Sequence, residues 1–287
     1  MYTIIIRLFQ ENSTMLECNH ITEMEGDDMT SSLLPATPLQ PRKRAILVGA
    51  CGGLGTALTH KLAREGWTLA LLSRREDCPA DLCAELNADG VSRARAYEHD
   101  VTHYAEVPSL LKKIIADLGG LDLLIYNAGV NFPPGPDQLN AENDIKMAEV
   151  NLLGAISWLA PVADLFKGAK SGTLVGISSV AGDRGRIGNP GYNTSKAGLT
   201  AYLEALRNRF TRHGVHVLTV IPGFMQTDML KAAQGGTFFV VPPERAADNI
   251  YKAILKRKQL IYTAPIWRWI MLVIKHVPSV IFRRLNF

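Results

Sequence analysis

The chain has 287 residues, of which 47% are hydrophobic and 20% are charged, and its formal net charge is +4. This is enough apolar material for one well-filled α/β domain. A net charge this small, without a long Lys/Arg run, argues against a nucleic-acid partner. The four cysteines match no zinc spacing, so we expect reduced thiols, no metal site and a cytoplasmic location. They are Cys18, Cys51, Cys78 and Cys83.

Residues 1–41 differ in composition from the rest of the chain. Polar stretches there are interrupted by Pro35, Pro38 and Pro41. Prolines at this spacing break helices, and the polar stretches offer little to bury. We therefore predict a poorly ordered N-terminal extension over 1–41.

From residue 44 onward, short apolar runs alternate with helical patterns. We predict strands at 45–48, 67–72, 94–98, 121–126, 172–177 and 215–221, and helices at 57–65, 80–88, 102–118, 142–166 and 192–213. The strands are apolar on both faces, which indicates a parallel sheet covered on both sides. The prediction is an α/β fold: a single doubly wound Rossmann domain over 42–263, with helices on both faces of a parallel sheet. An amphipathic segment follows at 264–287.

A glycine-rich turn follows the first strand and opens the first helix, with Gly49, Gly53 and Gly55 in a G-x-x-x-G-x-G spacing. Backbone N–H groups at a helix N-terminus bind pyrophosphate, and a Cβ at these positions would hold the phosphates away. The alternative is a tight turn without a ligand, but the strand–turn–helix context favours a dinucleotide. We expect cofactor contacts from Gly49, Cys51, Gly53, Leu54 and Gly55.

The end of the second predicted strand indicates which dinucleotide binds. Sites for NAD usually place an acidic residue there, whereas an arginine suits the 2′-phosphate of NADP. This chain has Ser73, Arg74 and Arg75. A guanidinium can pair with a phosphate through two hydrogen bonds. We predict NADP as the cofactor, with NADPH preferred over NADH and Ser73 and Arg74 in contact with it; solvated surface charges are the alternative.

A tyrosine and a lysine lie four residues apart on one predicted helix, at Tyr192 and Lys196. This spacing places both side chains on one face. A nearby ammonium lowers the pKa of a phenol, which makes it a usable acid or base near neutral pH. Ser179 follows the fifth predicted strand, where its hydroxyl can hydrogen-bond a substrate carbonyl oxygen. Thr227, after the sixth strand, is placed to meet the nicotinamide carboxamide.

These motifs together resemble the short-chain dehydrogenase/reductase family. The matching residues, in family order over about 44–228, are Gly49, Gly53, Gly55, Asp100-Val101, Asn127-Ala128-Gly129, Asn151, Ser179, Tyr192, Lys196, Pro222-Gly223 and Thr227. Each motif alone is weak, but the set in this order is specific. One departure is Val48, which stands where the family usually has a threonine that ties the turn to Asn127. The turn is therefore expected to be held differently here.

The resemblance implies roles for the matched residues. Asp100 and Val101 would lie beside the adenine, and Asn127 would stabilise the central sheet. Asn151 would bend its helix and bind a water that links Lys196 to solvent. The remaining implied cofactor contacts are Ala128, Gly129, Tyr192, Lys196, Pro222 and Gly223. Family members are commonly homodimers or homotetramers, and we expect one of these states.

The predicted reaction transfers a hydride between NADPH and a ketone or secondary alcohol. Ser179 polarises the carbonyl oxygen and Tyr192 provides the proton. Lys196 lowers the pKa of the tyrosine, and Asn151 completes a proton relay. The catalytic residues are thus expected to be Ser179, Tyr192, Lys196 and Asn151.

The C-terminal segment 264–287 is rich in aromatic, aliphatic and basic residues, such as Trp267, Trp269, Arg283 and Arg284. Such a segment suits peripheral contact with a membrane, with the tryptophans at headgroup depth. The alternatives are that it caps the protein's own substrate pocket or forms a homo-oligomer interface. Apolar residues within 223–241 are expected to cover the substrate, with Gly235 and Gly236 as hinges.

This segment, together with 181–186 and the tyrosine helix, resembles decaprenylphosphoryl-2-keto-ribose reductase-like proteins. That resemblance implies a lipid-linked keto-sugar substrate, a flavin oxidase as functional partner, and a place on the inner face of the membrane. Two alternatives remain open. One is a reductase of a soluble ketone, acyl thioester or steroid, and the other is a non-catalytic dinucleotide-binding regulator. The intact Ser/Tyr/Lys set disfavours the regulator.

Overall fold

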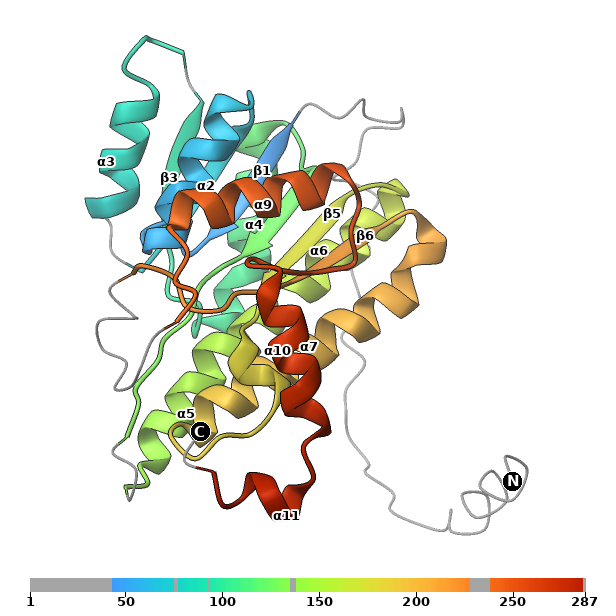
Figure 1. Ribbon diagram of the computed structural model, residues 1–287. Helices are drawn as coiled ribbons and strands as arrows, with labels where there is room; N and C mark the ends of the chain where they lie inside the picture. The colour runs from blue at the N-terminus through green and yellow to red at the C-terminus, as the bar shows by residue number, and fades with distance from the viewer. Residues whose placement is uncertain (1–42, 75–76, 92, 135–137, 228–237, 286–287) are drawn as a thin grey trace, which may run out of the picture.

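The computed structural model describes residues 43–74, 77–91, 93–134, 138–227 and 238–285, so the expected extension at 1–41 lies outside it. Seven parallel strands form one sheet in the order β3-β2-β1-β4-β5-β6-β7 (Figure 1). They are β1 (Arg44–Val48), β2 (Thr68–Ser73), β3 (Ala94–Glu98), β4 (Leu123–Tyr126), β5 (Thr173–Ile177), β6 (His216–Ile221) and β7 (Leu260–Tyr262). The strand order reverses between β1 and β4, the position at which open α/β sheets bind ligands.

Helices cover both faces of the sheet, because neighbouring residues on each strand point to opposite sides. Ala45 and Leu47 of β1 belong to one apolar core, whereas Ile46 and Val48 belong to the other. Helices α2 (Gly53–Arg64), α3 (Asp77–Leu86) and α9 (Pro243–Leu255) bury their apolar residues in the first core. Helices α4 (Val107–Leu118), α6 (Gly154–Ala169) and α7 (Pro190–Phe210) bury theirs in the second. The predicted doubly wound α/β domain is confirmed.

The helix expected over 142–166 is interrupted near its middle. Helix α5 (Ala141–Ala148) runs into a π-helical turn, η2 (Glu149–Leu153), before α6 continues. Such turns inside α-helices often mark functional positions, and this one contains Asn151. By length and composition the run Ala141–Ala169 could cross a membrane. However, Trp158, Leu159 and Val162 are fully buried in the second core, as in the core helix of a folded domain.

Helix α9 and strand β7 lie within residues 243–262, where no helix or strand was expected from the sequence. Strand β7 has only three residues and pairs with β6 at the edge of the sheet, so it carries little periodic signal. Beyond it, α10 (Ile266–His276) and α11 (Ser279–Phe282) lie below the sheet in Figure 1. Short 3-10 turns complete the fold: η1 (Tyr104–Glu106), η3 (Val180–Asp183) and η4 (Thr211–His213).

Candidate active site

The glycine-rich turn connects β1 to α2 at the sheet's reversal point. Gly49 has φ 88°, and a Cβ there would lie 2.5 Å from Ala128 N, so only glycine fits. A Cβ at Gly55 would collide with the carbonyl of Gly49. The N-cap residue of α2 is Gly52, and no side chain caps the first turn of the helix. The backbone N–H groups of that turn are therefore available to an anion. The turn therefore fits the pyrophosphate of a dinucleotide.

The turn is held by Asn127, which follows β4. Asn127 Nδ2 donates a hydrogen bond of 2.7 Å to Gly49 O. The backbone N–H groups of Asn127 and Ala128 both donate to Val48 O at 2.9 Å. Val48 has no hydroxyl that could tie the turn to Asn127. The turn is held nevertheless, because the side-chain amide of Asn127 bonds Gly49 O directly.

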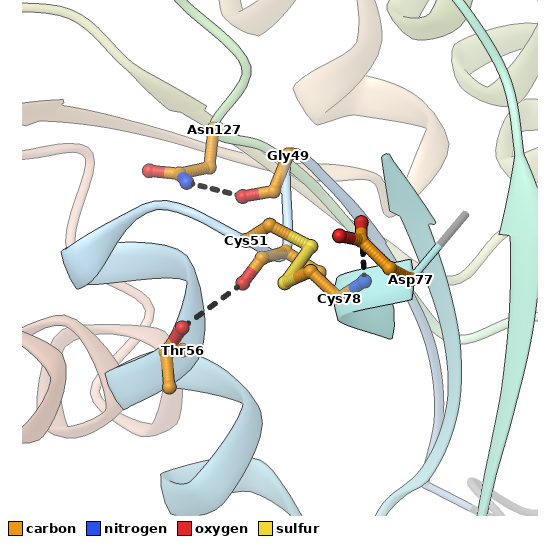
Figure 2. The surroundings of a disulfide bond; sticks show 7 residues. Gly49, Cys51, Thr56, Asp77, Cys78 and Asn127 are labelled. Atoms are coloured by element: carbon orange, nitrogen blue, oxygen red, sulfur yellow. Dashed lines mark hydrogen bonds between the residues drawn. A yellow bond between two sulfur atoms is a disulfide. The ribbon is translucent and has the colours of Figure 1, made fainter. Parts of the chain in front are cut away.

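A disulfide joins the turn to the start of α3. Cys51 Sγ is bonded to Cys78 Sγ, and their Cα atoms lie 5.9 Å apart (Figure 2). The expectation of reduced thiols is therefore wrong for these two cysteines. They are 27 residues apart in sequence, but β2 returns the chain to the same end of the sheet. Cys83 is free and buried, and burial raises the pKa of its thiol to about 11. Cys18 lies outside the described residues.

The end of β2 provides the charged residues expected near the adenosine. Ser73 ends the strand, and the following Arg74 is exposed. Burial raises the pKa of Asp100, but hydrogen bonds from Thr102 and the charge of Arg74 outweigh it and hold the pKa below its usual value. The two bonds to Asp100 Oδ1 come from Thr102 N at 2.9 Å and Thr102 Oγ1 at 2.7 Å. An exposed guanidinium beside this carboxylate is accessible to a phosphate. Arg75 lies outside the described residues.

Ser179 and Tyr192 meet in a cavity of about 450 Å³ beyond the ends of β4 and β5. Ser179 directly precedes η3, and its Oγ accepts a hydrogen bond of 3.1 Å from Ala181 N. Tyr192 lies in the first turn of α7, where Asn189 caps the helix by accepting from Tyr192 N at 3.2 Å. Burial raises the pKa of Tyr192, while a side-chain hydrogen bond with Ser179 opposes this. The phenol therefore stays protonated at neutral pH.

Lys196 lies one turn further along α7 and is 3% exposed. Its Nζ donates a hydrogen bond of 2.9 Å to Ile177 O and lies 5.8 Å from the centroid of the Tyr192 ring. Burial lowers the pKa of Lys196 to about 8. The ammonium is directed at the end of β5, and Ser179 is the group that opposes the effect of burial on the Tyr192 pKa. The lowering of this pKa by Lys196 stays a prediction.

Asn151 lies in the π-helical turn and is fully buried. Its Oδ1 accepts from Val130 N at 2.8 Å, and its Nδ2 donates to Val130 O and Ser195 Oγ, both at 3.0 Å. A Cβ added to Gly129 would lie 3.2 Å from Asn151 Oδ1 and 3.3 Å from Lys196 Nζ. The amide of Asn151 and the ammonium of Lys196 therefore border the same small space above Gly129, within hydrogen-bond reach of a molecule placed there.

Most of the expected site residues line this one cavity: Gly49, Gly53, Leu54, Asn127, Ala128, Gly129, Ser179, Tyr192, Lys196, Pro222, Gly223 and Thr227. Those expected at the adenosine end or behind the site do not line it: Cys51, Gly55, Ser73, Arg74, Asp100, Val101 and Asn151. Phe224, expected to cover the substrate, also lines the cavity. Sequence reasoning missed Asn131, Arg186 and Asn189, which lie on connections, and Asn193, which lies on α7 but belongs to no motif. Among the described residues, no cluster of His, Cys, Asp and Glu is suited to a metal ion.

The C-terminal segment packs against one wall of the cavity. Trp267 is 1% exposed, and a Cβ on Gly223 would collide with its indole ring. The ring also contacts Phe224, with centroids 5.5 Å apart. Lys275 Nζ pairs with Asp183 at 2.6 Å, which ties α10 to the η3 turn directly after Ser179. The inner face of the C-terminal segment thus supports the cavity wall. The expected hinges Gly235 and Gly236 lie outside the described residues.

Comparison with known proteins agrees with this geometry. A family model described as short chain dehydrogenase matches residues 43–236. An uncharacterized oxidoreductase of Myxococcus xanthus is 32% identical over 214 residues, which cover 75% of this chain and 84% of that protein. The 3-oxoacyl-[acyl-carrier-protein] reductase of a Synechocystis species is 31% identical over 186 residues, covering 64% of this chain and 75% of that protein.

Solved structures share the fold. A short chain dehydrogenase from Burkholderia cenocepacia, in complex with NADP, superimposes with a TM-score of 0.71 at 22% identity. The match covers 85% of this chain and 97% of that one.

Proposed function

This chain belongs to the short chain dehydrogenase family and is an NAD(P)-dependent oxidoreductase, and we propose that it uses NADPH to reduce a ketone to a secondary alcohol. The observation that carries the proposal is the position of the Tyr192 phenol together with Ser179 in the cavity beside the glycine-rich turn, where burial raises the pKa of the phenol. A phenol whose pKa is raised holds the proton that a reduction must deliver.

The cofactor fits the residues that surround the cavity. The uncapped start of α2 would hold its pyrophosphate, and Arg74 would pair with a 2′-phosphate that an acidic residue would repel. The relative solved with NADP bound is consistent with this choice. When bound, the nicotinamide supplies the hydride to the carbonyl carbon.

The chain's own residues handle the carbonyl oxygen and its proton. Ser179 Oγ–H donates a hydrogen bond to the oxygen, where negative charge develops. Tyr192 transfers its phenolic proton to that oxygen. The charged Lys196 then stabilises the phenolate left behind. A water in the space bounded by Asn151 and Lys196 would return the proton from solvent.

The substrate we infer is a ketone with an apolar part and a polar part, for which a lipid-linked keto-sugar is the leading candidate. The cavity supports this with apolar walls, such as Phe224 and Met225, and with amides at Asn131 and Asn189. A flavin oxidase that generates the ketone would be the functional partner of such an enzyme. A 3-oxoacyl thioester is the second candidate, favoured by the similarity to the Synechocystis reductase.

The test is Tyr192→Phe, which keeps the ring and removes the proton. We expect turnover to fall by about 10²–10⁴-fold, because Ser179 and Lys196 remain but no acid faces the carbonyl oxygen. NADPH binding, followed by cofactor fluorescence, should stay near the wild-type value. A variant that retains wild-type turnover would remove Tyr192 from this role and with it the proposed mechanism.

A further inference from the structure

The C-terminal helices present an apolar surface that no described part of the chain covers. Its residues, named here the outer face, are Ile266, Trp269, Leu272, Val273, Val280, Ile281 and Leu285. Trp269 is 62% exposed and Val273 is 67% exposed, whereas Trp267 and Met271 on the opposite side of α10 are buried. Helix α10 therefore has large apolar side chains on its exposed side as well as on its buried side, which is unusual for a helix in contact with water.

The charged side chains of residues 264–287 all have one sign. Residues 264–287 contain no Asp or Glu. Lys275 is engaged by Asp183, but Arg268, Arg283 and Arg284 are exposed. An apolar surface bordered by exposed guanidinium groups complements a surface that is both apolar and anionic.

A bilayer with anionic headgroups has both properties. Tryptophan rings lie at headgroup depth, and arginines close to the surface attract anionic lipid. A second copy of this chain is a poorer occupant, because a two-fold contact through the outer face would bring the same arginines of both copies together. The amphipathic segment is too short to cross the bilayer, so contact would be peripheral.

On the buried side of α10, aromatic contacts connect an exposed ring to the cavity. Phe238 is 47% exposed and stacks on Trp267, with ring centroids 6.1 Å apart. Trp267 in turn contacts Phe224, which lines the cavity. Exposed apolar surface and cavity wall are therefore joined by one cluster of aromatic rings.

We propose that the outer face docks on the surface of an anionic bilayer, with the cavity beside the membrane. A ketone that partitions into the bilayer then enters along apolar surface without crossing water. The proposed docking depends only on the surface of α10 and α11, whereas this route of substrate entry rests on the proposed reductase function.

The test is co-sedimentation of the full chain with vesicles, which requires neither cofactor nor substrate. We expect binding to mixed phosphatidylglycerol–phosphatidylcholine vesicles, and much weaker binding to phosphatidylcholine alone or at high salt. The double variant Arg283→Gln/Arg284→Gln should bind about 30-fold more weakly. Val273→Glu, which places a carboxylate on the outer face, should abolish binding.

The matched control is Val91→Glu. Val91 is 52% exposed and lies in the connection between α3 and β3, at the opposite end of the molecule from α11 in Figure 1. This variant should bind vesicles like the wild type, and all variants should bind NADPH normally. Equal binding by Val273→Glu and wild type overturns the proposal. The proposal is also overturned if the wild type is a dimer that does not bind vesicles and if Val273→Glu makes it monomeric. The outer face would then be a subunit interface.

Discussion

Reduction of the Cys51–Cys78 disulfide should lower the stability of the folded chain. The bond closes a loop between residues 27 apart in sequence, so reduction restores conformational freedom to the unfolded chain. A loop of this length corresponds to about 3.5 kcal/mol in the free energy of unfolding at 25 °C. For a domain of this size, this amounts to a decrease of roughly 7–14 °C in Tm. Both cysteines are partly exposed, which allows a reductant to reach them.

Thermal unfolding followed by circular dichroism, with and without dithiothreitol, measures this effect. The control is the Cys51→Ser/Cys78→Ser variant, whose Tm should match that of the reduced wild type and should not respond to dithiothreitol. If the wild-type Tm is unchanged by a reductant while free-thiol titration shows that both cysteines have been released, the reasoning from loop closure fails.

Three further predictions concern the candidate site. Burial lowers the pKa of Lys196 to about 8, so kcat/KM for NADPH should decrease as pH rises through this value and the ammonium is lost; a profile that stays flat well into the alkaline range would contradict a role for the cation. The same shift affects stability, because the cost of burying the charged lysine is present below about pH 8 and disappears as pH rises towards 10.5, the ordinary value for lysine. The stability advantage of Lys196→Met over wild type, measured by denaturant unfolding, should therefore shrink over that interval. Arg74→Asp should weaken NADPH binding much more than NADH binding, because it replaces a cation that can pair with the 2′-phosphate by a carboxylate that repels it; equal losses for the two cofactors, measured by fluorescence titration, would place Arg74 outside the phosphate site.

Much of the architecture follows from local pattern. The apolar runs at the first six strands, the glycines that end them and the four-residue spacing of Tyr192 and Lys196 depend on backbone sterics and helix period. These properties belong to residues near one another in sequence, and the structure has the corresponding elements at the expected places. Strand β7 and helix α9 were not predicted. Strand β7 is too short to show a period, and α9 follows a connection without a clear strand signal.

The sequence by itself determined the fold class, the glycine-rich turn and the set of polar residues that gather at the ends of β4 and β5. Only the tertiary structure decided that Cys51 pairs with Cys78, that Trp267 supports Gly223, and that burial raises the pKa of Tyr192 while lowering that of Lys196. The physical reason is distance along the chain. Helix and strand preferences arise between near neighbours in sequence, whereas disulfide pairing, ring packing and desolvation depend on segments that meet only after folding.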